Sequence, residues 1–153
     1  AMQMDPSKPL DAQFIDGMII HHQGAVTMAN EVLQKAEHPE LKAFAEAIIS
    51  AQTKEISDMQ GWRKAWYPEV ADTGGMDMGM GDMAIPSDES IPFDQRFLTA
   101  MISHHQGAID MAKMALEMNP EHSEIKTLSE AIIKAQEAEI EQMNTWLKEW
   151  YNQ

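Results

Sequence analysis

The chain has 153 residues, 14 of them Met and none of them Cys, and its 25 acidic and 11 basic residues give a net charge of −14 at pH 7. This charge argues against a nucleic-acid partner, which needs clustered Lys and Arg, whereas cations are attracted to it. The lack of Cys excludes disulfides, thiolate zinc sites and iron–sulfur clusters. No apolar run approaches the roughly 20 residues of a membrane span, so we expect no membrane insertion.

The sequence contains an internal repeat. Residues 14–25, FIDGMIIHHQGA, return 83 positions later as FLTAMISHHQGA at 97–108. A second block at 46–67, which begins EAIISAQ and ends WY, returns 84 positions later at 130–151. Two copies are too few for a solenoid, so we predict one domain built from a duplicated unit.

The first copy is predicted to form an antiparallel pair of helices. Apolar residues recur with helical spacing over 11–36. The pattern stops at Pro39, because proline disfavours the helical conformation of the residue before it. It resumes over 40–66 and ends before Pro68.

The second copy repeats this pattern over about 94–118 and 123–151, and Asp94 and Ser123 are predicted to be its N-caps. No run alternates with the period of two that is typical of a strand. Two such hairpins bury their apolar faces only against each other. We therefore predict an all-α four-helix bundle in a single domain, 1–153, made of hairpin repeat 1 at 11–67, a linker at 68–93 and hairpin repeat 2 at 94–151.

The predicted linker differs from the hairpins in composition. Its Gly, Pro and Asp residues cannot sustain a helix. A bundle helix of about 25 residues is roughly 37 Å long, so the linker could either cross the bundle or fold over its open end. Met usually fills gaps in a core, but no core is available here. We therefore predict metal binding by the four linker methionines, Met76, Met78, Met80 and Met83.

The His-His pair of each repeat carries the clearest chemical signal. Imidazole suits Cu, Zn, Fe and Ni, whereas thioether sulfur selects Cu(I). Met18 lies three and four residues before His21 and His22, so it shares a helix face with either. Folding of the hairpin brings Glu55 and Met59 opposite the pair, and we expect these donors to converge at the open end, with Glu55 either orienting a histidine or serving as an occasional ligand. The second repeat offers the same set, Met101, His104, His105, Glu139 and Met143.

A di-iron site is the main competitor of copper in such a bundle. Carboxylate-bridged di-iron proteins use Glu-x-x-His on two helices. Here the residues three positions before the histidines are Met18, Ile19, Met101 and Ile102. The hard ligand is missing and a soft thioether replaces it, which favours copper over iron and makes silver a suitable surrogate.

Three further features lead to predictions. Met114, Met118 and His122 have i, i+4, i+8 spacing near the end of the third helix and are predicted to form an additional metal site. Met28 lies about 15 Å along the helix axis from Met18 and is predicted to be core. A glycine inside a helix costs about 1 kcal/mol relative to Ala, so Gly24 is expected to permit close approach of two helices.

Both repeats resemble a known family. The string His-His-Gln-Gly-Ala followed by Ala-x-x-Ile-Ile-x-x-Gln-x-x-Glu-Ile-x-x-Met-x-x-Trp is similar to the bacterial ferritin-like bundles catalogued as a domain of unknown function. The resemblance covers about 14–67 and 97–151, and the Met-rich linker is most similar to that of a periplasmic copper-binding member. It implies a four-helix bundle, export to the periplasm, binding of Cu(I) and Cu(II), and a role in copper resistance. The motif ligands it implies are His21, His22, His104, His105, Met18, Met59, Met101 and Met143.

We therefore expect a copper-sequestering or copper-buffering protein, not an enzyme, with copper ions as its partner and any copper-accepting or efflux protein unidentified. Binding by histidine should weaken as the pH falls through the ordinary imidazole pKa of about 6.5. Two alternatives remain open: a cuprous oxidase or ferroxidase on the same bundle, and a metal-free structural or interaction bundle. The sequence does not decide whether the two His pairs form one shared site or two.

Overall fold

The computed structural model describes residues 5–75 and 84–153, and the linker methionines 76, 78, 80 and 83 lie outside this described part. Within it the chain forms four helices and no strand. They are α1 (Leu10–Lys35), α2 (Pro39–Trp66), α3 (Phe93–Glu117) and α4 (Ser123–Tyr151). The prediction of an all-α protein made of two hairpins is confirmed. None of the described helices is both long enough and apolar enough to span a membrane.

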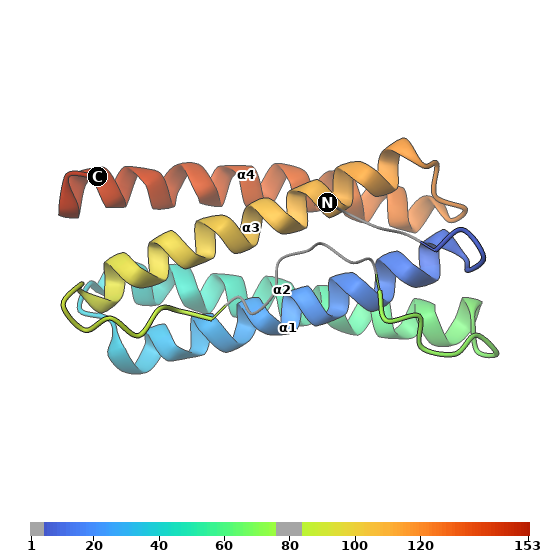
Figure 1. The fold of residues 1–153 in the computed structure, drawn as a ribbon, viewed down its shortest axis with the longest axis horizontal. Helices are drawn as coiled ribbons and strands as arrows, with labels where there is room; N and C mark the ends of the chain where they lie inside the picture. The colour runs from blue at the N-terminus through green and yellow to red at the C-terminus, as the bar shows by residue number, and fades with distance from the viewer. Residues whose placement is uncertain (1–4, 76–83) are drawn as a thin grey trace.

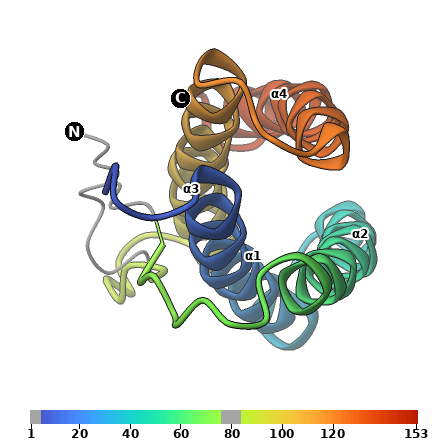
Figure 2. The same cartoon turned by 90° about the vertical axis from the view of Figure 1, so that its right-hand side faces the viewer.

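The two hairpins pack through their first helices. Extensive contacts join α1 to α2, α3 to α4, and α1 to α3. The helices α1 and α3 run side by side in opposite directions (Figure 1), and in the end view α2 and α4 lie apart from each other on one side of that pair (Figure 2). The midpoints of α1 and α3 meet at His21 and His104, and we call this place the α1–α3 crossing.

The helix ends differ from the predicted N-caps. The N-cap residues of α3 and α4 are Pro92 and His122, and none of the four described helices has a side-chain hydrogen bond at its N-cap. The prediction of Asp94 and Ser123 as N-caps is therefore wrong. Pro39 is the first residue of α2, where its missing N–H is not needed, and this agrees with the predicted break between the helices.

The apolar side chains form two core clusters, one toward each end of the bundle. One cluster joins Phe14, Met18 and Met59 of hairpin 1 to the second half of α3 and the first half of α4. The other joins Phe97 and Met101, among others, to the second half of α1 and the first half of α2. Each core is thus shared by both hairpins, as expected when two amphipathic hairpins bury their faces against each other.

Each hairpin also holds the turn of the other. The carboxylate of Asp94 accepts hydrogen bonds from the backbone N–H groups of Glu37 and His38 at 3.0–3.1 Å and lies 2.6 Å from Nδ1 of His38. The His38 ring stacks on Trp150 with ring centroids 3.6 Å apart. We call Asp94, His38 and Trp150 the first clasp.

The second clasp lies at the opposite end of the bundle and consists of Asp11, His122 and Trp66. Asp11 accepts hydrogen bonds from the backbone N–H groups of Glu121 and His122 and lies 2.8 Å from Nδ1 of His122. His122 stacks on Trp66 at 3.7 Å. Because each carboxylate belongs to one hairpin and holds the turn before the second helix of the other, the clasps are reciprocal, as in a two-fold interface.

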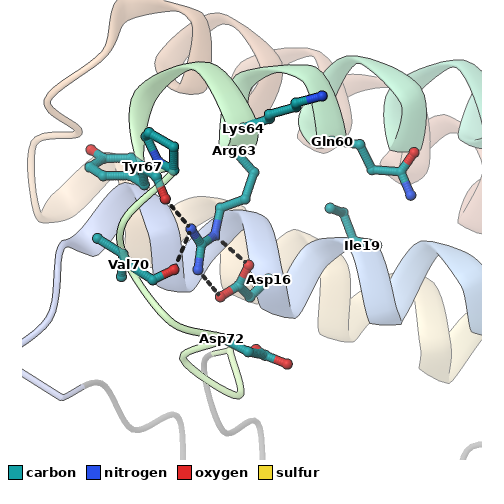
Figure 3. A pocket seen from close by; sticks show the side chains of 9 residues that line it. Asp16, Ile19, Gln60, Arg63, Lys64, Tyr67, Val70 and Asp72 are labelled. Atoms are coloured by element: carbon teal, nitrogen blue, oxygen red, sulfur yellow. Dashed lines mark hydrogen bonds and ion pairs between the residues drawn. The ribbon is translucent and has the colours of Figure 1, made fainter.

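The linker begins with an anchor on α1 (Figure 3). The guanidinium of Arg63 donates to both carboxylate oxygens of Asp16, from Nε at 2.7 Å and from Nη2 at 3.1 Å. Its remaining donors reach the carbonyl oxygens of residues 67, 70 and 71. The hydroxyl and the backbone N–H of Thr73 also donate to Asp16. Asp16 and Arg63, which line this surface pocket, are thus used to hold the chain.

Residues at the two described ends of the linker contact the bundle. Gly75 has φ +77°, and a Cβ there would lie 2.4 Å from the Cα of Gly17, so the backbones touch. Ile85 packs against the core cluster at the other end of the bundle. These two described ends therefore lie in different halves of the bundle. Hairpin 2 has Thr99, Ala100 and Leu147 at the positions equivalent to Asp16, Gly17 and Arg63, so the anchor is specific to the half that carries the linker.

Candidate metal centre

The four histidines of the two motifs meet at the α1–α3 crossing. His21 lies 11 residues after the start of α1, and His104 lies 11 residues after the start of α3. Both are therefore near mid-helix, and the expectation that each pair would lie at the open end of its hairpin is wrong. The physical reason is the hairpin packing: α1 and α3 run antiparallel and side by side (Figure 1), and the contact between His21 and His104 places the two pairs together in one cluster.

His21 and His104 are in direct contact. Their ring centroids lie 3.7 Å apart with an interplanar angle of 33°. These residues are equivalent in the repeat, and contact between equivalent residues marks the position of a two-fold axis. A Cβ at Gly24 would lie 3.1 Å from Nε2 of His104. The close approach predicted at Gly24 is therefore to an imidazole, and the glycine leaves space for that ring.

The other histidine of each pair is held by a glutamate. Nε2 of His22 lies 2.6 Å from Oε1 of Glu55, and Nε2 of His105 lies 2.5 Å from Oε1 of Glu139. Both imidazoles are fully buried, whereas the carboxylate side chains remain 24% and 26% exposed. The predicted orienting contact by Glu55 is thus present in the structure, and it occurs in both repeats.

Burial keeps the contacting histidines neutral. Desolvation, and then the neighbouring imidazoles, lower the pKa of His21 to about 2. The same causes, with desolvation again the largest, lower the pKa of His104 to about 4. Protons therefore compete with a metal ion for these two imidazoles only well below pH 6.5, which is about the pKa of an ordinary imidazole.

Several buried nitrogens of the cluster have no hydrogen-bond partner in the described part of the chain. They are Nε2 of His21, Nδ1 of His22 and Nδ1 of His105. A buried polar group left without a partner costs about 1–3 kcal/mol, so such groups are rare in a folded protein unless a ligand or function uses them. Three lone pairs in one buried cluster are the most distinctive chemical feature of the molecule.

The predicted methionine ligands flank the cluster on two sides. Met18 and Met59 are fully buried in one core cluster, and Met101 and Met143 are fully buried in the other. Met18 is one helical turn from His21. Their assignment as ligands stays a prediction. Met28 and its repeat equivalent Met111 are also buried core residues, as predicted.

The basis for the additional site near the end of α3 is wrong. The helix ends at Glu117, and the chain then reverses through Asn119, which has φ 55°. His122 therefore does not continue the face that carries Met114 and Met118, and it belongs to the second clasp. Met114 packs against a core cluster and Met118 is 40% exposed.

No group of three or more His, Asp or Glu side chains in residues 5–75 and 84–153 is arranged to hold a metal ion. A site at the crossing therefore needs sulfur donors beside the imidazoles. Sequence reasoning missed the clasp carboxylates Asp11 and Asp94. The signal available was that both occupy the same position of the repeat, three residues before a buried phenylalanine.

The structure is similar to solved structures of a copper-binding protein. CopM in the Cu(II)-bound form is 44% identical, with a TM-score of 0.79 over 92% of this chain and 97% of that one. CopM in the Cu(I)-bound form is 40% identical, with a TM-score of 0.78 over 94% and 99%. A DUF305 protein of Streptomyces coelicolor is 28% identical, with a TM-score of 0.74 over 92% and 93%.

A shorter sequence match links the chain to a viral protein. An uncharacterised protein of Acanthamoeba polyphaga mimivirus is 39% identical over 49 residues, which is 32% of either chain. The alignment thus spans about a third of that relative. The sequence profile of the domain of unknown function DUF305 matches residues 11–90 and 94–153, nearly the whole chain. This protein belongs to the DUF305 family.

Proposed function

We propose that the protein binds Cu(I) and Cu(II) at the α1–α3 crossing and sequesters or buffers them. The observation that carries this proposal is the buried imidazole cluster with three unpartnered nitrogens. Soft cations bound there, each held also by sulfur, would supply the missing partners of these nitrogens. Support comes also from the similarity to CopM, whose solved structures include Cu(II)-, Cu(I)- and silver-bound forms.

The chemistry of the donors fits copper. Neutral imidazole binds both copper oxidation states, and thioether sulfur prefers Cu(I). Met18 and Met101 lie one turn from His21 and His104 on the same helices, so each repeat can add sulfur to nitrogen. The negative charge of the chain attracts the ion. The exposed thioethers expected of Met76, Met78, Met80 and Met83 would capture Cu(I) before it reaches the centre.

We place this binding outside the cytoplasm and in copper resistance, as storage of the ion and not as catalytic turnover. A site built from His and Met without Cys has no thiol to lose in an oxidising compartment, where the thiols of a Cys site would oxidise. Fractionation of the native host and its survival in copper after deletion of the gene test the location and the role. Oxygen uptake upon addition of Cu(I) tests storage against turnover, and no uptake is expected.

Competition titrations with a chromophoric Cu(I) chelator test the binding site. In the double variant His21→Gln/His104→Gln we expect the Cu(I) affinity to fall at least tenfold. The matched control is His38→Gln/His122→Gln, which removes the same number of imidazoles from the clasps, and its affinity should stay close to that of the wild type. Circular dichroism confirms that each variant is folded. Equal affinity of all three proteins would refute a site at the crossing.

A further inference from the structure

The two histidine–glutamate contacts indicate which ring nitrogen of His22 and of His105 carries a hydrogen. Nε2 of His22 and Nε2 of His105 each face a carboxylate oxygen, at 2.6 and 2.5 Å. A carboxylate only accepts hydrogen bonds, so in each pair Nε2 must carry the hydrogen. A hydrogen of each ring is therefore assigned to Nε2, and Nδ1 is the nitrogen that faces no carboxylate.

The environment of Nδ1 supports this assignment. Nδ1 of His22 and Nδ1 of His105 are buried, and no group in the described residues is within hydrogen-bond reach. A second hydrogen on Nδ1 would create a buried N–H without an acceptor, which costs about 1–3 kcal/mol. A bare lone pair at that atom is the less costly state, and it is also the only state of imidazole nitrogen that can bind a metal.

We propose that Glu55 and Glu139 are positioning residues that fix the tautomer of His22 and His105, so that both histidines bind the soft ion through Nδ1. This inference rests on the proposed function and adds to it the ligating atom. A carboxylate that holds the far nitrogen of a metal-binding imidazole also raises the basicity of the ring. The same arrangement arises in both repeats, from α2 in one and from α4 in the other.

A purely structural role of the glutamates predicts a different result. A glutamate that only provided a hydrogen-bond partner for a buried histidine would not determine which nitrogen binds the ion. Its removal would change the stability of the fold but not the ligating atom. His21, which has no hydrogen bond to a carboxylate in the described residues, has a buried Nε2 without a partner. The cluster would therefore offer nitrogens of both kinds, and the glutamates determine which kind each histidine contributes.

Nitrogen-15 NMR of the full-length protein labelled at histidine tests the assignment directly. In the metal-free protein the two rings should show a protonated Nε2 and a bare Nδ1. Titration with Ag⁺, which is diamagnetic, should shift the Nδ1 resonances and leave the Nε2–H signals in place. The proposal is overturned if Nδ1 carries the hydrogen in the metal-free protein, or if silver shifts Nε2.

Variants separate positioning from structure. Glu55→Gln/Glu139→Gln keeps the shape but lets the amide donate or accept, so both tautomers become populated and Ag⁺ affinity should fall about 10–100-fold. Glu46→Gln/Glu130→Gln changes the same charge at equivalent, exposed positions of the same helices and should bind silver as the wild type does. Unchanged silver affinity and an unchanged tautomer in Glu55→Gln/Glu139→Gln would overturn the inference.

The same experiments distinguish two kinds of failure. If the wild type binds neither Ag⁺ nor Cu(I), the proposed function itself fails. If it binds them while the signals of His22 and His105 stay unchanged, these two rings are not ligands, and the role of the glutamates is refuted while ion binding itself stands.

Discussion

Replacing Asp94 by Ala removes the carboxylate that joins the start of hairpin 2 to the turn of hairpin 1. This side chain is 1% exposed and accepts hydrogen bonds from the backbone N–H groups of Glu37 and His38. It also lies 2.6 Å from Nδ1 of His38. Alanine leaves all these donors in place without their acceptor, and an unfilled space beside them.

The expected loss is large for a domain of this size. A hydrogen bond to a charged group contributes about 1.5–3 kcal/mol, and removing one partner of a buried pair costs about 3–5 kcal/mol. The imidazole of His38 is 29% exposed, so water can replace part of its contact with Asp94. The lower end of the range of about 3–5 kcal/mol therefore applies. We expect Asp94→Ala to reduce the free energy of unfolding by about 3 kcal/mol, out of the roughly 5–15 kcal/mol typical of a domain.

Urea denaturation followed by circular dichroism measures this loss. Asp58→Ala is the matched control, because Asp58 pairs only with the exposed Lys54 on the helix surface, and such pairs contribute about 0–1 kcal/mol. Asp11→Ala should resemble Asp94→Ala, and the double variant should be additive, because the clasps lie at opposite ends of the bundle. A loss in Asp94→Ala no larger than in Asp58→Ala would refute the stabilising role of the clasp.

Two further predictions concern the crossing. Gly24→Ala places a Cβ 3.1 Å from Nε2 of His104 and should lower the free energy of unfolding by about 1–3 kcal/mol. Gly61 has open space around it, so Gly61→Ala should raise the free energy of unfolding by up to about 1 kcal/mol. Thermal denaturation compares the two variants, and a higher melting temperature for Gly24→Ala than for Gly61→Ala would contradict the packing at Gly24. Because the folded-state pKa values of His21 and His104 lie below the unfolded value, unfolding becomes easier as the pH falls from about 6.5 to 4, by about 1.4 kcal/mol per pH unit for each ring. The free energy of unfolding of His104→Gln, measured by urea titration, should depend less steeply on pH than that of the wild type. Equal slopes for the two proteins would contradict the lowered pKa of His104.

The local part of the fold was predictable from the sequence. Helical spacing and Pro39 define the first hairpin to within a residue or two of the observed ends, and the repeat transfers this result to the second. The contact between His22 and Glu55 was also predictable, since a hairpin that turns near residue 38 must bring these positions opposite each other.

The arrangement of the two hairpins was not predictable in the same way. Helical periodicity identifies which face of a helix is buried but not the point where two helices cross. The placement of His21 against His104 depends on that point. The clasps escaped notice for a related reason: Asp94 stands where an N-cap is common, and only the tertiary structure shows that its carboxylate holds the turn before α2 instead of capping its own helix.

Both features belong to the interface between the hairpins, and this links binding to folding. His21 is covered by a ring from the other hairpin, and each turn is capped from across the interface. An ion held by imidazoles of both repeats would favour the joined state by RT ln(1 + [L]/Kd), about 2.7 kcal/mol at a hundredfold excess over Kd. Copper should therefore add a similar increment to the free energy of unfolding of Asp94→Ala and of the wild type, although the clasp lies far from the histidines.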